Sequence, residues 1–167
     1  LSVSSAASDV YKRQPLYNFG TNQNNWSLGA SRVTLKYSEK TTVIWKLDAD
    51  QYSRFIADGY APNTDAVAHN FITRDGYEDI LQAPTVVVIQ GPLYNDEATT
   101  LPSVLTVGVG PVTIFHEGKY IEGTWRRNDI SDPFEFLDTN QNKIDVPPSK
   151  QWIHLLPLNG EITISDN

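Results

Sequence analysis

Apolar and polar residues alternate along much of the chain, which predicts β-strands instead of helices. Residues 32–38 and 42–48 place an apolar side chain at every second position, the period of a strand with one buried face. If the two strands pair antiparallel around residues 39–41, all pairs on one face are apolar, and a one-residue slip would scatter them. The expected pairs are Tyr37 with Val43, Leu35 with Trp45, and Val33 with Leu47.

A second hairpin is predicted to follow directly. Asp48 suits the first position of a type I turn, so residues 48–51 should turn the chain into a strand over residues 52–56. In this register Arg54 lies opposite Trp45.

The second half of the chain predicts several more strands. Residues 85–90 form a continuous β-branched run, which is typical of a strand covered on both faces. Glu117-Gly118 marks a tight hairpin, because Gly tolerates a positive φ. In the strand expected at 152–156, His154 should point outward, alternating with Ile153 and Leu155. The other expected strands are 104–108, 112–116 and 119–125, with shorter ones at 134–137, 144–146 and 162–164.

Helical periodicity is nearly absent, so the expected fold class is mostly β: an antiparallel curved sheet, a sandwich or a partly open barrel, with long loops and little helix. Residues 57–83 and 91–102 are punctuated by turn-forming residues and are expected to be loops, the first with at most a short helix or strand. The expected organisation is a foreign or disordered tail at 1–14, an irregular linker at 15–31, a single β-rich domain at 32–157, and a C-terminal strand or tail at 158–167.

Composition narrows the possible functions. The net charge is −7, and no basic run exceeds a pair of residues, which argues against nucleic acid as a partner. The chain has no Cys, so disulfides, thiolate chemistry and Cys-based zinc sites are excluded. No apolar run approaches the ~20 residues needed to cross a bilayer.

The first fourteen residues, LSVSSAASDVYKRQ, show no strand or helix period. The string resembles a peptide produced when sequencing-adapter DNA is translated at the end of a metagenomic gene, and a genuine flexible tail is the alternative interpretation. The sequence contains no Met, even at position 1, so we expect a fragment whose gene continues upstream.

Two stretches carry a specific resemblance. They are Val107-Gly-Val-Gly110 through Gly118-Lys-Tyr-Ile-Glu-Gly-Thr-Trp-Arg-Arg127, and Pro148-Ser-Lys-Gln-Trp-Ile-His-Leu-Leu-Pro157. Together with the order of segments from residue 32 to residue 157, they resemble the C-terminal domain of the YerB family of bacterial lipoproteins. Two departures stand out: Ser149 replaces a usual Gly, and the family's pHxD segment has no clean counterpart near His69.

The resemblance implies an extracytoplasmic protein that is anchored to the membrane in its full-length form. The family's lipid-attachment Cys and larger N-terminal domain are absent from this sequence, so membrane contact is expected only through that absent anchor. The missing N-terminal domain is itself an expected partner. The family has no established biochemical activity, so no catalytic residue carries over.

The sequence offers no strong catalytic or metal motif. Asp138 begins a D-x-N-x-N run like that of a calcium loop, but Lys143 and Ser149 stand where Gly and Glu are needed, and a hairpin loop is the preferred interpretation. There is no G-x-S-x-G nucleophile motif. Metal-ligand spacing is missing among the histidines, which are His69, His116 and His154. We therefore expect no catalytic residue, metal or cofactor in this chain.

Aromatic side chains give the candidates for ligand binding. Arg54 opposite Trp45 suits a ligand platform, because a guanidinium stacks on an indole; the alternative is an Arg that covers core aromatics. Exposed aromatics on a sheet hold sugar faces in many carbohydrate-binding modules, and the candidates here are Trp26, Tyr120, Trp125 and Trp152. For Trp125 and Trp152, core packing explains the aromatic equally well.

Three functions stay open. The first is a non-enzymatic envelope module that binds a glycan, a peptide or a partner domain through its sheet face and the loop at 91–102. The second is an accessory domain of a hydrolase-type enzyme whose main site lies in the missing domain, with Arg54, His116 or Asp138 contributing at the boundary. The third is a purely structural domain.

Overall fold

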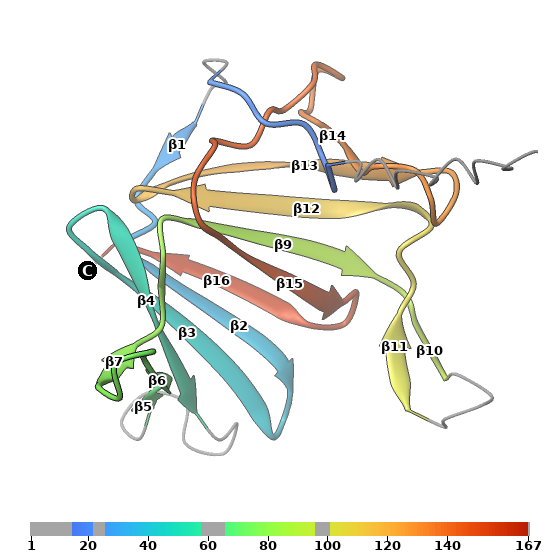
Figure 1. The fold of residues 1–167 in the computed structure, drawn as a ribbon. Helices are drawn as coiled ribbons and strands as arrows, with labels where there is room; N and C mark the ends of the chain where they lie inside the picture. The colour runs from blue at the N-terminus through green and yellow to red at the C-terminus, as the bar shows by residue number, and fades with distance from the viewer. Residues whose placement is uncertain (1–14, 22–25, 58–65, 96–100, 167) are drawn as a thin grey trace, which may run out of the picture.

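The computed structural model describes residues 15–21, 26–57, 66–95 and 101–166, and over these residues the chain forms strands and no helix (Figure 1). The expected mostly β class is confirmed. Two sheets make up the body of the fold, and two short hairpins lie outside them. The described residues contain no helix that could cross a membrane.

The first sheet, termed the β12 sheet, has the strand order β1-β13-β12-β9-β15, with β14 also paired to β13. Its pairings are antiparallel except for β9 with β15, which run parallel. Its strands are β1 (Ser27–Leu28), β9 (Thr85–Gly91), β12 (Gly108–His116), β13 (Lys119–Arg127), β14 (Glu135–Leu137) and β15 (Gln151–Pro157).

The second sheet, termed the β3 sheet, has the order β16-β2-β3-β4-β5, with β8 also paired to β4. All of its pairings are antiparallel. Its strands are β2 (Arg32–Ser38), β3 (Thr41–Asp48), β4 (Gln51–Ala57), β5 (Val67–Ala68), β8 (Gln82–Ala83) and β16 (Glu161–Ser165).

Segments that were expected to be loops contain short hairpins. β6 (Asn70–Ile72) pairs with β7 (Glu78–Ile80), and β10 (Leu93–Asn95) pairs with β11 (Pro102–Val104). The strand expected at 104–108 is wrong, because the chain leaves the β10–β11 hairpin there and enters the β12 sheet at Gly108, whose φ of 122° suits glycine. Residues 144–146 contribute an isolated bridge at Val146 and not a regular strand.

The register expected for the first hairpin is wrong by two residues. Val33 pairs with Trp45 and Leu35 pairs with Val43. One residue of the difference comes from a tighter turn, in which Ser38 pairs with Thr41, and the other from a register shift between Lys36 and Ser38. Such a bulge adds one residue to β2 before the turn. A shift of two keeps the same side chains on the same face, so the predicted apolar face is preserved although its pairs are not.

The next two hairpins agree with the sequence. Trp45 pairs with Arg54 as expected, although Ala49 in the turn has a positive φ of 55°, which a type I turn does not contain. The β12–β13 turn has positive φ at both Glu117 (48°) and Gly118 (77°), as a tight two-residue hairpin requires.

Strand β9 is buried on both faces and separates two apolar cores. Val86 and Val88 point into a core shared with the β3 sheet, where they meet Val33, Leu35, Trp45 and Tyr52 among others. Val87 and Ile89 point into a second core on the opposite face of the β12 sheet. That second core is closed by side chains from the N-terminal segment and the region around β14: Tyr17, Phe134, Phe136, Ile144 and Val146.

His154 on β15 points inward, which corrects the expectation that it faces solvent. Its residue is 3% exposed, whereas its neighbours Ile153 and Leu155 are 36% and 42% exposed. The inward face of β15 therefore carries Trp152, His154 and Leu156. The apolar–polar pattern alone could not show this, because it favours burial of the apolar residues Ile153 and Leu155 over burial of the histidine between them.

The buried imidazole of His154 links β15 to the β3 sheet. The Trp45 indole Nε1 donates to His154 Nε2 at 2.8 Å, and Tyr37 Oη lies 2.6 Å from His154 Nδ1. Since an indole can only donate, Nε2 carries no proton, and the neutral imidazole donates from Nδ1 to Tyr37. Burial, reinforced by the positive charge of Arg54, lowers the pKa of His154 to about 3.

Gly110 provides a test of packing between β9 and β13. A Cβ at this position would lie 2.4 Å from Gln90 O and 2.6 Å from Trp125 Nε1, the two groups that form a 2.7 Å hydrogen bond. Gly110→Ala should lower the free energy of unfolding by about 2 kcal/mol, measured by urea denaturation. Val109→Ala, at an exposed neighbour, is the control. An unchanged midpoint for Gly110→Ala would contradict this packing.

The neutral state of His154 predicts a pH dependence of stability. Above about pH 6.5 the imidazole is neutral in both states; below it only the unfolded chain takes up the proton, until the folded pKa of about 3 is reached. The free energy of unfolding should therefore fall by up to about 1.4 kcal/mol per pH unit over this range. In urea titrations between pH 7 and pH 4.5, the His154→Asn variant should lack this part of the decrease in the free energy of unfolding. The His116→Gln variant should retain it. Equal slopes for wild type and His154→Asn would exclude the buried neutral imidazole.

Candidate functional site

Six polar and aromatic side chains gather between β15 and the β3 sheet. Trp45 and Arg54 form a cross-strand pair on β3 and β4, and β15 crosses over them. His69, between β5 and β6, is held beside β4 because its backbone N–H donates to Arg54 O at 2.9 Å. We term this group the Arg54 cluster: Tyr37, Trp45, Arg54, His69, Trp152 and His154.

The guanidinium of Arg54 lies against two indoles. Its Cζ is 4.9 Å from the ring centroid of Trp152 and 6.0 Å from that of Trp45, within the range of cation–π attraction. Arg54 Nη1 donates to His69 Nδ1. Arg54 Nε is buried and has no hydrogen-bond partner within the described residues.

Arg54 also has no carboxylate within ion-pair distance among the described residues, whose salt bridges all involve other cations. Burial lowers the pKa of Arg54 from its usual value, and the nearby Tyr37 phenol partly opposes this. Burial correspondingly raises the pKa of Tyr37 to about 12. The half-buried cation of Arg54 is therefore stabilised by the rings of Trp45 and Trp152 and by one imidazole, that of His69.

An open pocket of about 160 Å³ adjoins the Arg54 cluster. Trp152 belongs to both, and Leu81 in the pocket wall accepts a hydrogen bond from Arg54 N at 2.9 Å. Gln82 and Lys150 also line the pocket, and the Gln82 side-chain amide is fixed by a 2.9 Å hydrogen bond to Ser53 Oγ. The pocket is lined by Phe71, Leu81, Gln82, Ala83, Lys150, Gln151 and Trp152.

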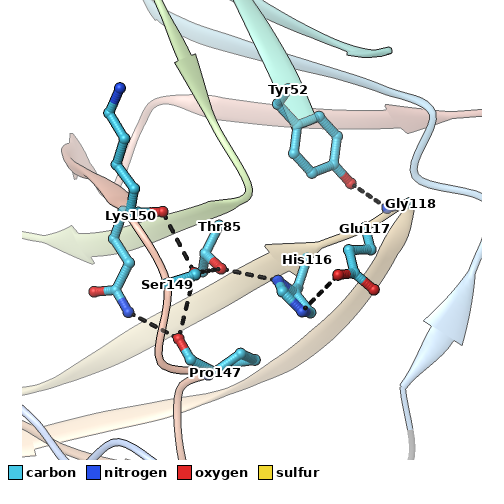
Figure 2. A network of polar contacts seen from close by, with 9 residues as sticks. Tyr52, Thr85, His116, Glu117, Gly118, Pro147, Ser149 and Lys150 are labelled. Atoms are coloured by element: carbon cyan, nitrogen blue, oxygen red, sulfur yellow. Dashed lines mark hydrogen bonds and ion pairs between the residues drawn. The ribbon is translucent and has the colours of Figure 1, made fainter. Parts of the chain in front are cut away.

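His116 belongs to a separate polar network at the start of β9 (Figure 2). Its Nδ1 lies 2.9 Å from Thr85 Oγ1, which lies 2.7 Å from Ser149 Oγ, and its Nε2 lies 3.5 Å from Glu117. The same view shows the Tyr52 hydroxyl accepting a 3.1 Å hydrogen bond from Gly118 N. The serine reaches the imidazole only through a fully buried threonine, so the pair does not form a nucleophile and its base. The network joins β9, β12 and the loop before β15.

The remaining predicted ligand residues lie apart from the Arg54 cluster. Trp125 is fully buried, with its indole bonded to Gln90 O, so it cannot present a face to a ligand. Tyr120 is half-buried against Phe115, and their ring centroids are 6.2 Å apart. Asp138 accepts hydrogen bonds from the Asn142 side-chain amide, Asn142 N and Asn140 N within a turn, and these bonds lower its pKa.

Metal binding has no support in the described residues, where no three His, Asp or Glu side chains gather. A larger hollow of about 270 Å³ lies beside β13 and β14, and its arginines already bond to neighbouring protein groups, Arg126 to Glu135 and Arg127 to Asp132 O. Arg126 and Lys143 share the carboxylate of Glu135 there, which holds the pKa of that group below its usual value.

Sequence reasoning found three members of the Arg54 cluster, namely Arg54, Trp45 and Trp152. It missed the other three. No local pattern marks His69, because it reaches the cluster from outside a regular strand. The alternation of His154 with Trp152 could have indicated a shared face, had Trp152 been assigned to the interior.

Residues 33–153 match the family described as "Protein of unknown function (DUF3048) C-terminal domain". The crystal structure of the YerB protein from Bacillus subtilis superposes with a TM-score of 0.58 at 15% sequence identity, which shows a shared fold. That match covers 88% of this chain and 46% of YerB, so the chain spans about half of that protein. No curated protein sequence matches this chain. Because the family match extends over well more than half of the chain, the chain belongs to the DUF3048 C-terminal domain family.

Proposed function

We propose that this domain is a non-enzymatic binding module of a cell-envelope protein, and that its ligand lies on Trp152 where β4, β8 and β15 meet. One observation carries the proposal: Trp152 is a half-buried indole that lies between an open pocket and an arginine with no carboxylate partner among the described residues. Ligand sites typically combine an apolar wall with a few placed polar groups, and this junction has both.

The hydrogen bonds of His69 and His154 favour a binding role for this site over acid–base catalysis. His154 has both ring nitrogens engaged and a pKa of about 3, so it stays neutral and occupied near pH 7. His69 Nδ1 accepts from Arg54 and therefore has no free lone pair there. A general base needs an available nitrogen with a pKa near the working pH.

The envelope location rests on the resemblance of the sequence to YerB lipoproteins. In this proposal the full-length protein is anchored outside the cytoplasm by a lipid on its N-terminal part. Wall glycans, wall peptides or envelope proteins are then the molecules that the domain meets.

A second candidate function is contact with a partner domain, and the β10–β11 hairpin favours it. Leu93 and Tyr94 are 50% and 49% exposed on a two-stranded hairpin outside both sheets. Such hairpins are marginally stable alone, and exposed apolar side chains on them suit an interface. The chain spans about half of YerB, so the occupant in this proposal is the remaining half of the full-length protein.

The partner role predicts that Leu93→Ser with Tyr94→Ser should weaken association with that half, supplied as a separate chain, at least tenfold by calorimetry. Ile130→Ser, at another exposed apolar position, is the matched control. Equal binding by the hairpin variant would rule out this surface.

The binding role predicts that soluble muropeptides from a cell-wall digest change the tryptophan fluorescence of the domain saturably and raise its melting temperature. Trp152→Ala should weaken this binding at least tenfold, because loss of a stacking surface costs about 1–3 kcal/mol. Trp26→Ala is the control, since Trp26 packs on the opposite core. Melting curves without ligand establish that both variants fold. The proposal fails if no fragment binds, or if Trp152→Ala binds as well as wild type.

A further inference from the structure

We infer that the ligand is a carboxylate on a carbon that also bears a small apolar side chain, such as the C-terminal residue of a peptide. The carboxylate binds Arg54 and the side chain enters the adjoining pocket. This inference rests on the proposed binding function and specifies the chemical class that the Trp152 site selects.

The charge of Arg54 is the first argument. A guanidinium keeps its proton at any ordinary pH, so its partial burial cannot be relieved by deprotonation. Within the described residues it has aromatic faces and one imidazole as neighbours, but no carboxylate. An arriving anion therefore meets a cation that folding has already desolvated and oriented, which reduces the cost of binding.

The unused donors of Arg54 are the second argument. Nη1 is engaged by His69, and Cζ lies 4.9 Å from the ring centroid of Trp152 and 6.0 Å from that of Trp45. The guanidinium can still donate a hydrogen bond in its own plane, because Nε has no hydrogen-bond partner among the described residues. A planar carboxylate matches such an edge with two parallel hydrogen bonds.

The pocket supplies the third argument. Its walls at Phe71, Leu81, Ala83 and Trp152 are apolar, and its volume of about 160 Å³ is below that of sites for drug-sized ligands. A single side chain suits it. Lys150, which is exposed, also lines the pocket, in a protein whose net charge is −7.

The test compares two probes that differ in one group, N-acetyl-leucine and N-acetyl-leucinamide, titrated into the whole chain. Binding is followed by tryptophan fluorescence and by the NMR resonance of the Arg54 Nε–H. The acid should bind at least tenfold more tightly than the amide and shift that resonance. Arg54→Gln should reduce the affinity for the acid to that for the amide, and Arg54→Lys should only partly restore it.

Lys46→Gln is the matched control. Lys46 lies on β3 beside Trp45, with its Nζ 4.4 Å from the ring centroid of Phe55, so it is another cation held against an aromatic ring in the same sheet. This variant should bind the acid as wild type does. Melting curves confirm that each variant is folded before its titration.

Equal binding of acid and amide, or unchanged binding by folded Arg54→Gln, would overturn the carboxylate assignment. Tighter binding of inorganic phosphate than of N-acetyl-leucine would overturn it in favour of a phosphate site. If muropeptides bind through Trp152 while the acid shows no preference over the amide, the ligand class is wrong and the binding function stands. If neither probe nor muropeptide binds, both proposals fall.

Discussion

The fold depends on one constraint, which is that strand β9 has no polar face. Its side chains from Thr85 to Ile89 are all buried, so both sides of the strand must be covered at once. The β3 sheet covers one side, and Tyr17 with the segment around β14 covers the other. The apparently irregular segments before β2 and after β13 are therefore parts of a core, because without them Val87 and Ile89 would face water.

A buried imidazole enters the inter-sheet core where β15 crosses the β3 sheet. There the imidazole of His154 satisfies the Trp45 indole, and the same indole lies near the Arg54 guanidinium. The side chain of Trp45 is thus part of both the buried core and the candidate site. Burial of His154 keeps the imidazole neutral, and this avoids placing a second positive charge beside Arg54.

Strand class, most strand positions and the Trp45–Arg54 pair follow from the sequence, because period-2 patterning and turn chemistry act locally. The register of the first hairpin does not, since a tighter turn and a bulge together shift the pairing by two residues and leave the apolar face unchanged. The inward position of His154 also escapes prediction, because it depends on partners more than a hundred residues away. For the same reason the candidate site could be predicted only in part: Trp152 meets Arg54 through packing, and nothing in the sequence between them indicates it.

The pairing of β16 with β2 has a consequence for how the chain folds. Ile164 pairs with Val33, so this edge of the β3 sheet stays open until residues 161–165 have been synthesised. Loop closure over such a separation is entropically costly, and folds dominated by distant pairings form slowly. Until β16 is added, the backbone edge of β2 therefore stays unpaired, and the β3 sheet reaches its native cooperativity only once residues 161–165 are available.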